Sequence, residues 1–132
     1  MHNRDTYMQT LLSYKDKTEI IKILTGIRRC GKSTLLELYK KHLLDNGVKD
    51  EQIIHIRFES LEFENIRTYK ELNQFVLDRI HTDEMYYILL DEVQFVEKWE
   101  RAVNSLRLLK NTDIIITGSN AYMLSSDLST LI

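Results

Sequence analysis

The sequence contains no proline, four glycines and one cysteine among its 132 residues. The single cysteine, Cys30, excludes an internal disulfide and favours a reducing compartment, so we expect a cytoplasmic protein. No apolar run approaches the roughly 20 residues that a membrane span needs. Residues 1–10 are polar and mixed in charge, unlike a signal peptide. We therefore expect no membrane partner.

A strong charge of either sign is also lacking. The formal net charge is -2, so no overall basic field supports nucleic acid as a partner, although a local basic patch stays open. Hydrophobic residues make up 43% and charged residues 29%, as in an ordinary globular protein. The length fits one domain, and there is no repeat, low-complexity tract or interior linker.

Strand-like and helical segments alternate along the chain. Runs rich in apolar and β-branched residues predict strands at Glu19–Thr25, Ile53–Phe58, Tyr86–Leu90 and Asp113–Thr117. Helical spacing predicts helices at Arg4–Tyr14, at Ser33–Leu44, after the capping box Thr68–Glu71, and at Glu97–Leu109. This order predicts an α/β fold with three layers, in which a parallel sheet carries helices on both faces.

Two segments have less regular patterns. The run Ile53–Phe58 alternates apolar residues with His55 and Arg57, which predicts a strand with one wet face at a sheet edge. Residues 121–132 are rich in serine and show only a weak helical pattern.

The segment GIRRCGKS matches the P-loop pattern G-x-x-x-x-G-K-[ST] in full, between a predicted strand and a predicted helix. Glycines let such a loop curl so that its N–H groups and the helix start face phosphate oxygens. Lys32 can then reach the β- and γ-phosphates, and the Ser33 hydroxyl can ligate Mg²⁺. A chance match on an ordinary strand–turn–helix is the alternative. We predict that ATP binds to Gly26, Ile27, Arg28, Arg29, Cys30, Gly31, Lys32, Ser33 and Thr34.

A second candidate element is the pair Asp91-Glu92, which follows the apolar run Tyr86–Leu90. Ligands of open α/β sheets bind at the carboxyl ends of the strands. Asp91 can hold Mg²⁺ there through a water or the Ser33 hydroxyl, and Glu92 can polarise the attacking water. A solvated strand end, or a cap for the next helix, is the alternative.

Polar residues also end the last predicted strand. Ser119 or Asn120 could touch the γ-phosphate or orient the attacking water, and we include Asn120 among the catalytic candidates. Serine and asparagine are equally favoured as helix caps, so that alternative stays open. Glu59, which ends the second predicted strand, is better explained as a solvated residue.

These residues resemble a group of prokaryotic AAA-type P-loop ATPases, which have an N-terminal AAA domain and an appended C-terminal domain. The resemblance rests on ILTGIRRCGKSTLL, YYILLDEVQFVEKWERAVNSL and IIITGSNAYMLSSDLS, and it covers nearly the whole chain. It implies that the strand ending near Asn120 lies between the P-loop strand and the Asp91 strand, with the Ile53 strand at the edge. It also implies the phosphate, Mg²⁺, water and sensor roles given above.

The sequence departs from these ATPases in stopping at Ile132. Members of the group continue into a further strand, an arginine that acts on the γ-phosphate, and the C-terminal domain. We therefore expect this chain to be the front part of a longer ATPase. The edge of the Glu19–Thr25 strand is then predicted to be exposed and open to self-association. Without the arginine, which can contribute ~10³–10⁵ in rate, the chain alone is expected to hydrolyse ATP poorly.

The leading hypothesis is an Mg-ATP-dependent ATPase that acts on an absent domain, a protein partner or a second copy of itself. One alternative is a nucleotide-binding switch with negligible turnover, which the early stop favours and the Asp91-Glu92 pair opposes. A DNA-associated ATPase would need basic patches that the chain does not clearly have. A small-molecule kinase would need a lid segment, and none is evident.

Overall fold

The computed structural model describes residues 4–25, 31–118 and 129–131. Its helices and strands are α1 (Arg4–Ser13), β1 (Ile21–Leu24), α2 (Gly31–Asp45), β2 (Ile53–Arg57), α3 (Tyr69–Leu77), β3 (Tyr86–Asp91), α4 (Trp99–Arg107), β4 (Thr112–Thr117) and β5 (Ser129–Leu131). Short 3₁₀ helices lie at Asp50–Gln52, Leu61–Phe63 and Val93–Phe95. From α1 to β4, the alternation of strand and helix is the one that the sequence predicts.

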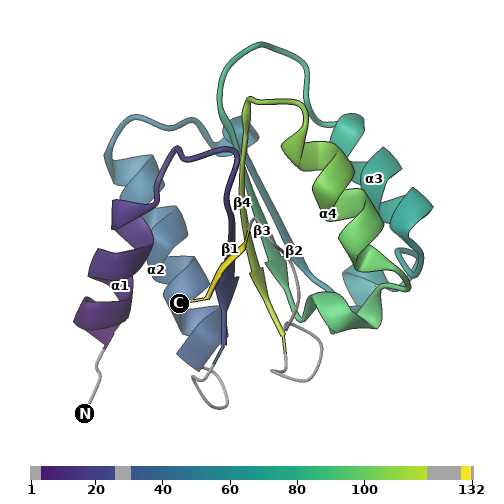
Figure 1. The fold of residues 1–132 in the computed structure, drawn as a ribbon, viewed down its shortest axis with the longest axis horizontal. Coiled ribbons are helices and arrows are strands. Elements are labelled where there is room, and N and C mark those ends of the chain that lie inside the picture. Colours follow the sequence, from purple (N-terminus) through teal and green to yellow (C-terminus); the bar gives the residue numbers. More distant parts are fainter. Residues whose placement is uncertain (1–3, 26–30, 119–128, 132) are drawn as a thin grey trace.

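The strands form one parallel sheet in the order β2-β3-β4-β1-β5. Helices α1 and α2 pack on one face of the sheet, and α3 and α4 pack on the other (Figure 1). Every residue of β1, β3 and β4 is buried, as expected for strands covered on both sides. The three-layer α/β/α class and the predicted order of the first four strands are confirmed.

The prediction of an exposed edge on β1 is wrong. Strand β5 pairs in parallel with β1, placing Ile21 opposite Ser129 and Ile23 opposite Leu131. The weak helical pattern noted for the end of the chain is therefore not followed at Ser129–Leu131. A run of three residues is too short for its periodicity to identify a strand. Since β1 is paired on both sides, the reason for expecting self-association through it no longer holds.

Strand β2 forms the sheet edge, as predicted, but its polar face is only partly wet. The Arg57 side chain is 57% exposed, whereas that of His55 is 9% exposed. Helix α2 covers the histidine, whose Nδ1 lies 3.8 Å from Oε2 of Glu37. Burial lowers the pKa of His55, which favours the neutral imidazole at pH 7. Alternation in the sequence identifies a face of a strand but does not reveal a helix lying over it.

Helix α2 connects the packing of the core to the candidate P-loop. Its buried residues recur at helical spacing, and they are Leu35, Leu36, Tyr39 and Leu43. The helix ends at Asp45, and Gly47 has a φ of 92°, a left-handed conformation that glycine adopts readily. The buried face of α2 packs on the sheet. Its first residues, Gly31 and Lys32, therefore lie near the carboxyl end of β1 (Figure 1).

A polar network, which we call the amino-end cluster, lies near the amino ends of β1 and β4; it comprises Asp16, Lys22, Tyr87 and Asp113, of which Lys22 and Asp113 are fully buried. The Lys22 ammonium donates to Oδ1 of Asp113 at 3.0 Å and to the carbonyl of Lys17 at 2.6 Å. Asp113 also accepts the Asp16 N–H at 2.7 Å, and the Tyr87 hydroxyl donates to Asp16 at 2.7 Å. Burial raises the pKa of Asp113 against the opposing effect of Lys22.

Candidate functional site

The candidate site lies where the start of α2 meets the carboxyl ends of β3 and β4. Five residues form what we call the carboxyl-end cluster: Lys32, Ser33, Asp91, Glu92 and Thr117. Thr34 follows in the first turn of α2. The other predicted site residues, Gly26 to Cys30, Ser119 and Asn120, lie outside the described residues.

Asp91 is held on both of its carboxylate oxygens. The Ser33 hydroxyl donates to Oδ2 at 2.6 Å, and the Thr117 hydroxyl donates to Oδ1 at 2.7 Å. Asp91 is only 2% exposed, and hydrogen bonds to a charged group are each worth about 1.5–3 kcal/mol. The carboxylate therefore has a fixed orientation, with one oxygen directed at the start of α2.

Glu92 leaves the strand in an unusual backbone conformation. Its φ of 63° and ψ of 55° are left-handed, which turns the chain sharply after Asp91. The Glu92 N–H donates to the Thr117 hydroxyl at 2.9 Å. The carboxylate accepts a hydrogen bond of 2.6 Å from the amide of Gln94. Both the backbone and the side chain of Glu92 are thus held by neighbours.

Lys32 reaches across the site from the helix. Its ammonium donates to the carbonyl of Gly118 at 2.8 Å and lies 3.9 Å from Oε2 of Glu92. The Lys32 and Glu92 side chains are 12% and 22% exposed, so a ligand can approach this pair. A lysine ammonium at a helix start is the arrangement that binds phosphate groups.

Ser33 and Asp91 present a hydroxyl and a carboxylate side by side, two oxygen donors that a metal ion could use. A hydroxyl and a carboxylate are hard oxygen ligands, and Mg²⁺ is typically held by one or two carboxylates together with substrate phosphates. The Ser33 hydroxyl and the Asp91 carboxylate are 2.6 Å apart, so one ion could contact both. Within the described residues there is no group of three or more histidine, cysteine or acidic residues that would form a complete metal cage by itself. The pair fits an ion that shares its coordination with phosphate.

Three residues of the site were missed in the sequence. Thr117 closes β4 and is fully buried, Gln94 holds the Glu92 carboxylate, and Arg57 lies with Nε 3.8 Å from Oδ2 of Asp91. Thr117 ends the predicted strand Asp113–Thr117, just before Ser119 and Asn120, whose side chains are the ones predicted to meet the γ-phosphate or the attacking water. A threonine at the end of a buried strand beside the Asp91 strand was the available signal.

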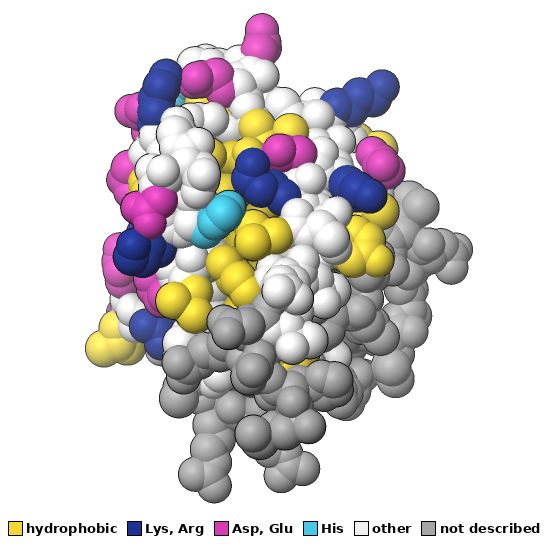
Figure 2. Space-filling view, turned by 90° about the vertical axis from the view of Figure 1, so that its left-hand side faces the viewer, with side chains coloured by type: hydrophobic (Ala, Val, Ile, Leu, Met, Phe, Trp, Pro, Cys, Tyr) yellow, Lys and Arg dark blue, Asp and Glu magenta, His cyan; other side chains and the backbone are white. Residues whose placement is uncertain are grey.

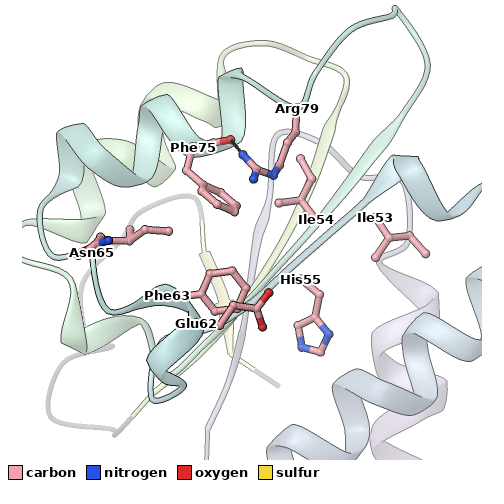
Figure 3. Close-up of a pocket in the computed structure, with 9 residues that line it drawn as sticks. Ile53, Ile54, His55, Glu62, Phe63, Asn65, Phe75 and Arg79 are labelled. Atoms are coloured by element: carbon pink, nitrogen blue, oxygen red, sulfur yellow. Dashed lines mark hydrogen bonds between the residues drawn. The ribbon is translucent and has the colours of Figure 1, made fainter.

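A separate groove of about 470 Å³ runs along the amino half of β2 (Figure 3). Ile53, Ile54 and His55 line it from the strand, and Phe63 and Phe75 line it from the connecting segment and α3. The Arg79 guanidinium lies 3.4 Å from the centroid of the Phe75 ring. The groove mixes apolar and charged groups, and it lies away from the carboxyl ends of the strands that form the candidate site.

The three-layer fold and the family to which the chain belongs are those of a nucleotide-binding, ATPase-like domain. The chain matches the AAA domain family over residues 18–132 and belongs to that family.

Three relatives extend the comparison. An uncharacterized protein of Haemophilus influenzae is 43% identical over 133 residues, which cover 100% of this chain and 33% of the relative. Two uncharacterized proteins of Methanocaldococcus jannaschii, MJ1544 and MJ1637, are 32% and 30% identical, each over 83% of this chain and 23% of the relative. The chain therefore spans at most about a third of the length of these relatives. The solved structure of C. elegans PCH-2 is similar with a TM-score of 0.49 and 16% identity, over 96% of this chain and 40% of that chain.

The described surface shows no field of one sign on the side where α1 and α2 lie. Acidic and basic side chains are interspersed there, with hydrophobic side chains between them (Figure 2). This face therefore gives no support to nucleic-acid binding. Among residues 4–25, 31–118 and 129–131, no helix has the length and apolar character needed to cross a membrane.

Proposed function

We propose that this chain binds Mg-ATP at the carboxyl-end cluster and carries the groups that hydrolyse it, with a low rate expected for the chain by itself. The observation that carries the proposal is the meeting of Lys32 and Ser33 with Asp91 and Glu92, which are about 60 residues away in the sequence. Membership of the AAA domain family supports a nucleotide as the ligand. The full P-loop pattern that ends at Ser33 supports a triphosphate.

The residues that hold ATP follow from their position at the helix start. Lys32 binds the β- and γ-phosphates, and N–H groups between Gly26 and Thr34 surround the phosphate oxygens. Ser33 and Asp91 would hold Mg²⁺, which when bound neutralises phosphate charge.

Glu92 is the proposed general base. It accepts a proton from the water that attacks the γ-phosphorus, and the bond to the leaving ADP oxygen breaks, giving ADP and phosphate. Asn120 or Ser119 orients that water in this proposal. The hydrogen bonds of Glu92 to Gln94 and Thr117 support a fixed base, because proton transfer requires a defined geometry.

We further propose that the nucleotide state acts on something outside this chain. The chain corresponds to 33% of the Haemophilus influenzae relative and 23% of the two archaeal relatives, so most of such a protein lies beyond the ATP site. The target is an appended domain, a protein partner or a second copy. A switch without turnover is the competing function, and single-turnover measurement of ATP cleavage separates it from an ATPase.

Calorimetric titration with ATP, with and without Mg²⁺, tests the binding step. We expect saturable, Mg²⁺-dependent binding that Lys32→Ala abolishes. Lys41→Ala is the matched control, because Lys41 is on the same helix, is 72% exposed and pairs with Asp45 on the surface. Equal binding by the Lys32→Ala and Lys41→Ala variants, or no binding by the folded wild-type chain, would contradict the proposal.

A further inference from the structure

Thr117 is the last residue of β4, and its side chain joins the two acidic residues of the candidate site. The hydroxyl hydrogen is donated to Oδ1 of Asp91 at 2.7 Å. The hydroxyl oxygen accepts the backbone N–H of Glu92 at 2.9 Å. Thr117 is 0% exposed, so water does not compete for either hydrogen bond.

The hydrogen bond to Asp91 holds Oδ1, the carboxylate oxygen that Ser33 does not bind. Ser33 occupies the other oxygen, so the carboxylate is bound from opposite sides by two hydroxyls. Without the Thr117 hydroxyl, Oδ1 would be a buried acceptor with no donor, and the carboxylate would be free to rotate away from Ser33. Partners of this kind orient the residues that hold a metal ion.

The bond to Glu92 fixes the turn that presents the proposed base. Glu92 has a left-handed backbone, which residues other than glycine adopt only when the surrounding structure enforces it. The Thr117 hydroxyl accepts the N–H of this residue and therefore helps to hold the turn. The same oxygen atom thus controls where Glu92 leaves the strand and how Asp91 is oriented.

We propose that Thr117 is a positioning residue that couples the Mg²⁺-holding Asp91 to the base Glu92. This inference rests on the proposed function. A hydroxyl is required because one group must both donate and accept, which valine cannot do and serine can.

A threonine at the other end of the same strand offers a matched control. Thr112 is also 0% exposed, and its hydroxyl donates to the carbonyl of Leu106 at 2.8 Å. That bond holds the end of α4 against β4 and does not involve the carboxyl-end cluster. Replacing either threonine with valine removes one buried hydroxyl, but only Thr117→Val removes it from the acidic pair.

The test compares Thr117→Val, Thr117→Ser and Thr112→Val with wild type, after thermal unfolding has shown that each is folded. We measure kcat and KM for ATP, and the Mg²⁺ concentration that half-saturates nucleotide binding. For Thr117→Val we expect kcat to fall by about 10- to 100-fold and the required Mg²⁺ to rise, because residues that orient metal ligands have effects of this size. Thr117→Ser should restore both quantities to within about threefold, and Thr112→Val should change only the unfolding temperature.

Three results would overturn the proposal: wild-type kcat and Mg²⁺ dependence in Thr117→Val, equal impairment of Thr117→Ser and Thr117→Val, or equal catalytic loss in Thr112→Val. If Thr117→Val does not fold, Thr117→Ala takes its place, with the same expected losses. If the wild-type chain binds Mg-ATP but does not cleave it, the proposed ATPase activity fails. The Mg²⁺ dependence of binding still decides the role of Thr117.

Discussion

The two polar clusters of the sheet contain similar groups but have different surroundings. In the amino-end cluster, the Lys22 and Asp113 side chains are 1% and 0% exposed, and both charges meet groups of the same chain. In the carboxyl-end cluster, Asp91 is also buried, but Lys32 and Glu92 beside it are 12% and 22% exposed. A buried charge therefore does not identify a functional site by itself. What distinguishes the second cluster is that its lysine and the acid facing it are partly exposed, whereas Lys22 and Asp113 are enclosed.

The clusters also differ in how well their charges are matched. The Lys22–Asp113 pair has a separation of 3.0 Å, and further hydrogen bonds complete both groups. The Lys32–Glu92 pair has a separation of 3.9 Å, and the lysine donates its short hydrogen bond to a backbone carbonyl. We infer that the first cluster has a structural role, whereas the Lys32 ammonium and the Glu92 carboxylate of the second can meet a ligand.

The largest expected effect is on catalysis at the carboxyl-end cluster. Glu92→Gln should lower kcat for ATP hydrolysis by about 10²–10⁴-fold, because the amide cannot accept the proton, while ATP still binds. Phosphate release measures the rate and calorimetry measures the binding. Glu100→Gln, an exposed change in the first turn of α4, is the control. Equal hydrolysis by Glu92→Gln and wild type would remove Glu92 from the mechanism.

The amino-end cluster should respond in stability instead. Asp113→Ala leaves the Lys22 ammonium buried without its counter-charge, which should cost about 3–5 kcal/mol in the free energy of unfolding. Denaturant unfolding measures this loss, and the double change Lys22→Met with Asp113→Ala should recover part of it. Wherever the variant remains folded, its affinity for Mg-ATP should be that of wild type. Loss of ATP binding without loss of stability would break the distinction between the clusters.

A smaller effect is expected at Gln94, which holds the Glu92 carboxylate at 2.6 Å. Gln94→Met keeps a long side chain but removes the donor, so kcat should fall by about tenfold with little change in KM. Gln74→Met is a close control, because Gln74 donates to Asp78 at the same distance on the exposed face of α3. If both methionine variants hydrolyse ATP equally well, the Gln94 amide does not position the base.

The smallest effect is expected at Glu71, an exposed carboxylate that belongs to neither cluster. It shows how much a surface carboxylate contributes to stability. Hydrogen bonds from the Arg67 and Thr68 N–H groups hold the pKa of Glu71 below its ordinary value. A lowered pKa in the folded state adds stability above the unfolded pKa of about 4.3, and this is lost as the pH falls through the folded value. The unfolding temperature of Glu71→Gln should therefore lie below that of wild type at pH 7, and the gap should close toward pH 3. A gap that widens on acidification would contradict this assignment.

The sequence determined the local features of this protein. Apolar runs and helical spacing predicted β1 to β4 and all four α-helices of the described residues, and the capping box at Thr68 is present as predicted. These features can be predicted from the sequence because helix and strand periods, caps and turns depend on neighbouring residues. The P-loop pattern and the Asp91-Glu92 pair indicated the strand ends at which the structure brings Lys32 and Ser33 close to Asp91 and Glu92.

Only the tertiary structure decided which distant groups touch. Lys22 and Asp113 are 91 residues apart in the sequence, and Thr117 meets Asp91 because β4 lies beside β3. The pairing of β5 with β1 and the burial of His55 under α2 could not be predicted either, because they too are contacts between distant segments. Side-chain periodicity is a local property, whereas contacts between strands and helices depend on the order in which the whole chain packs around its core.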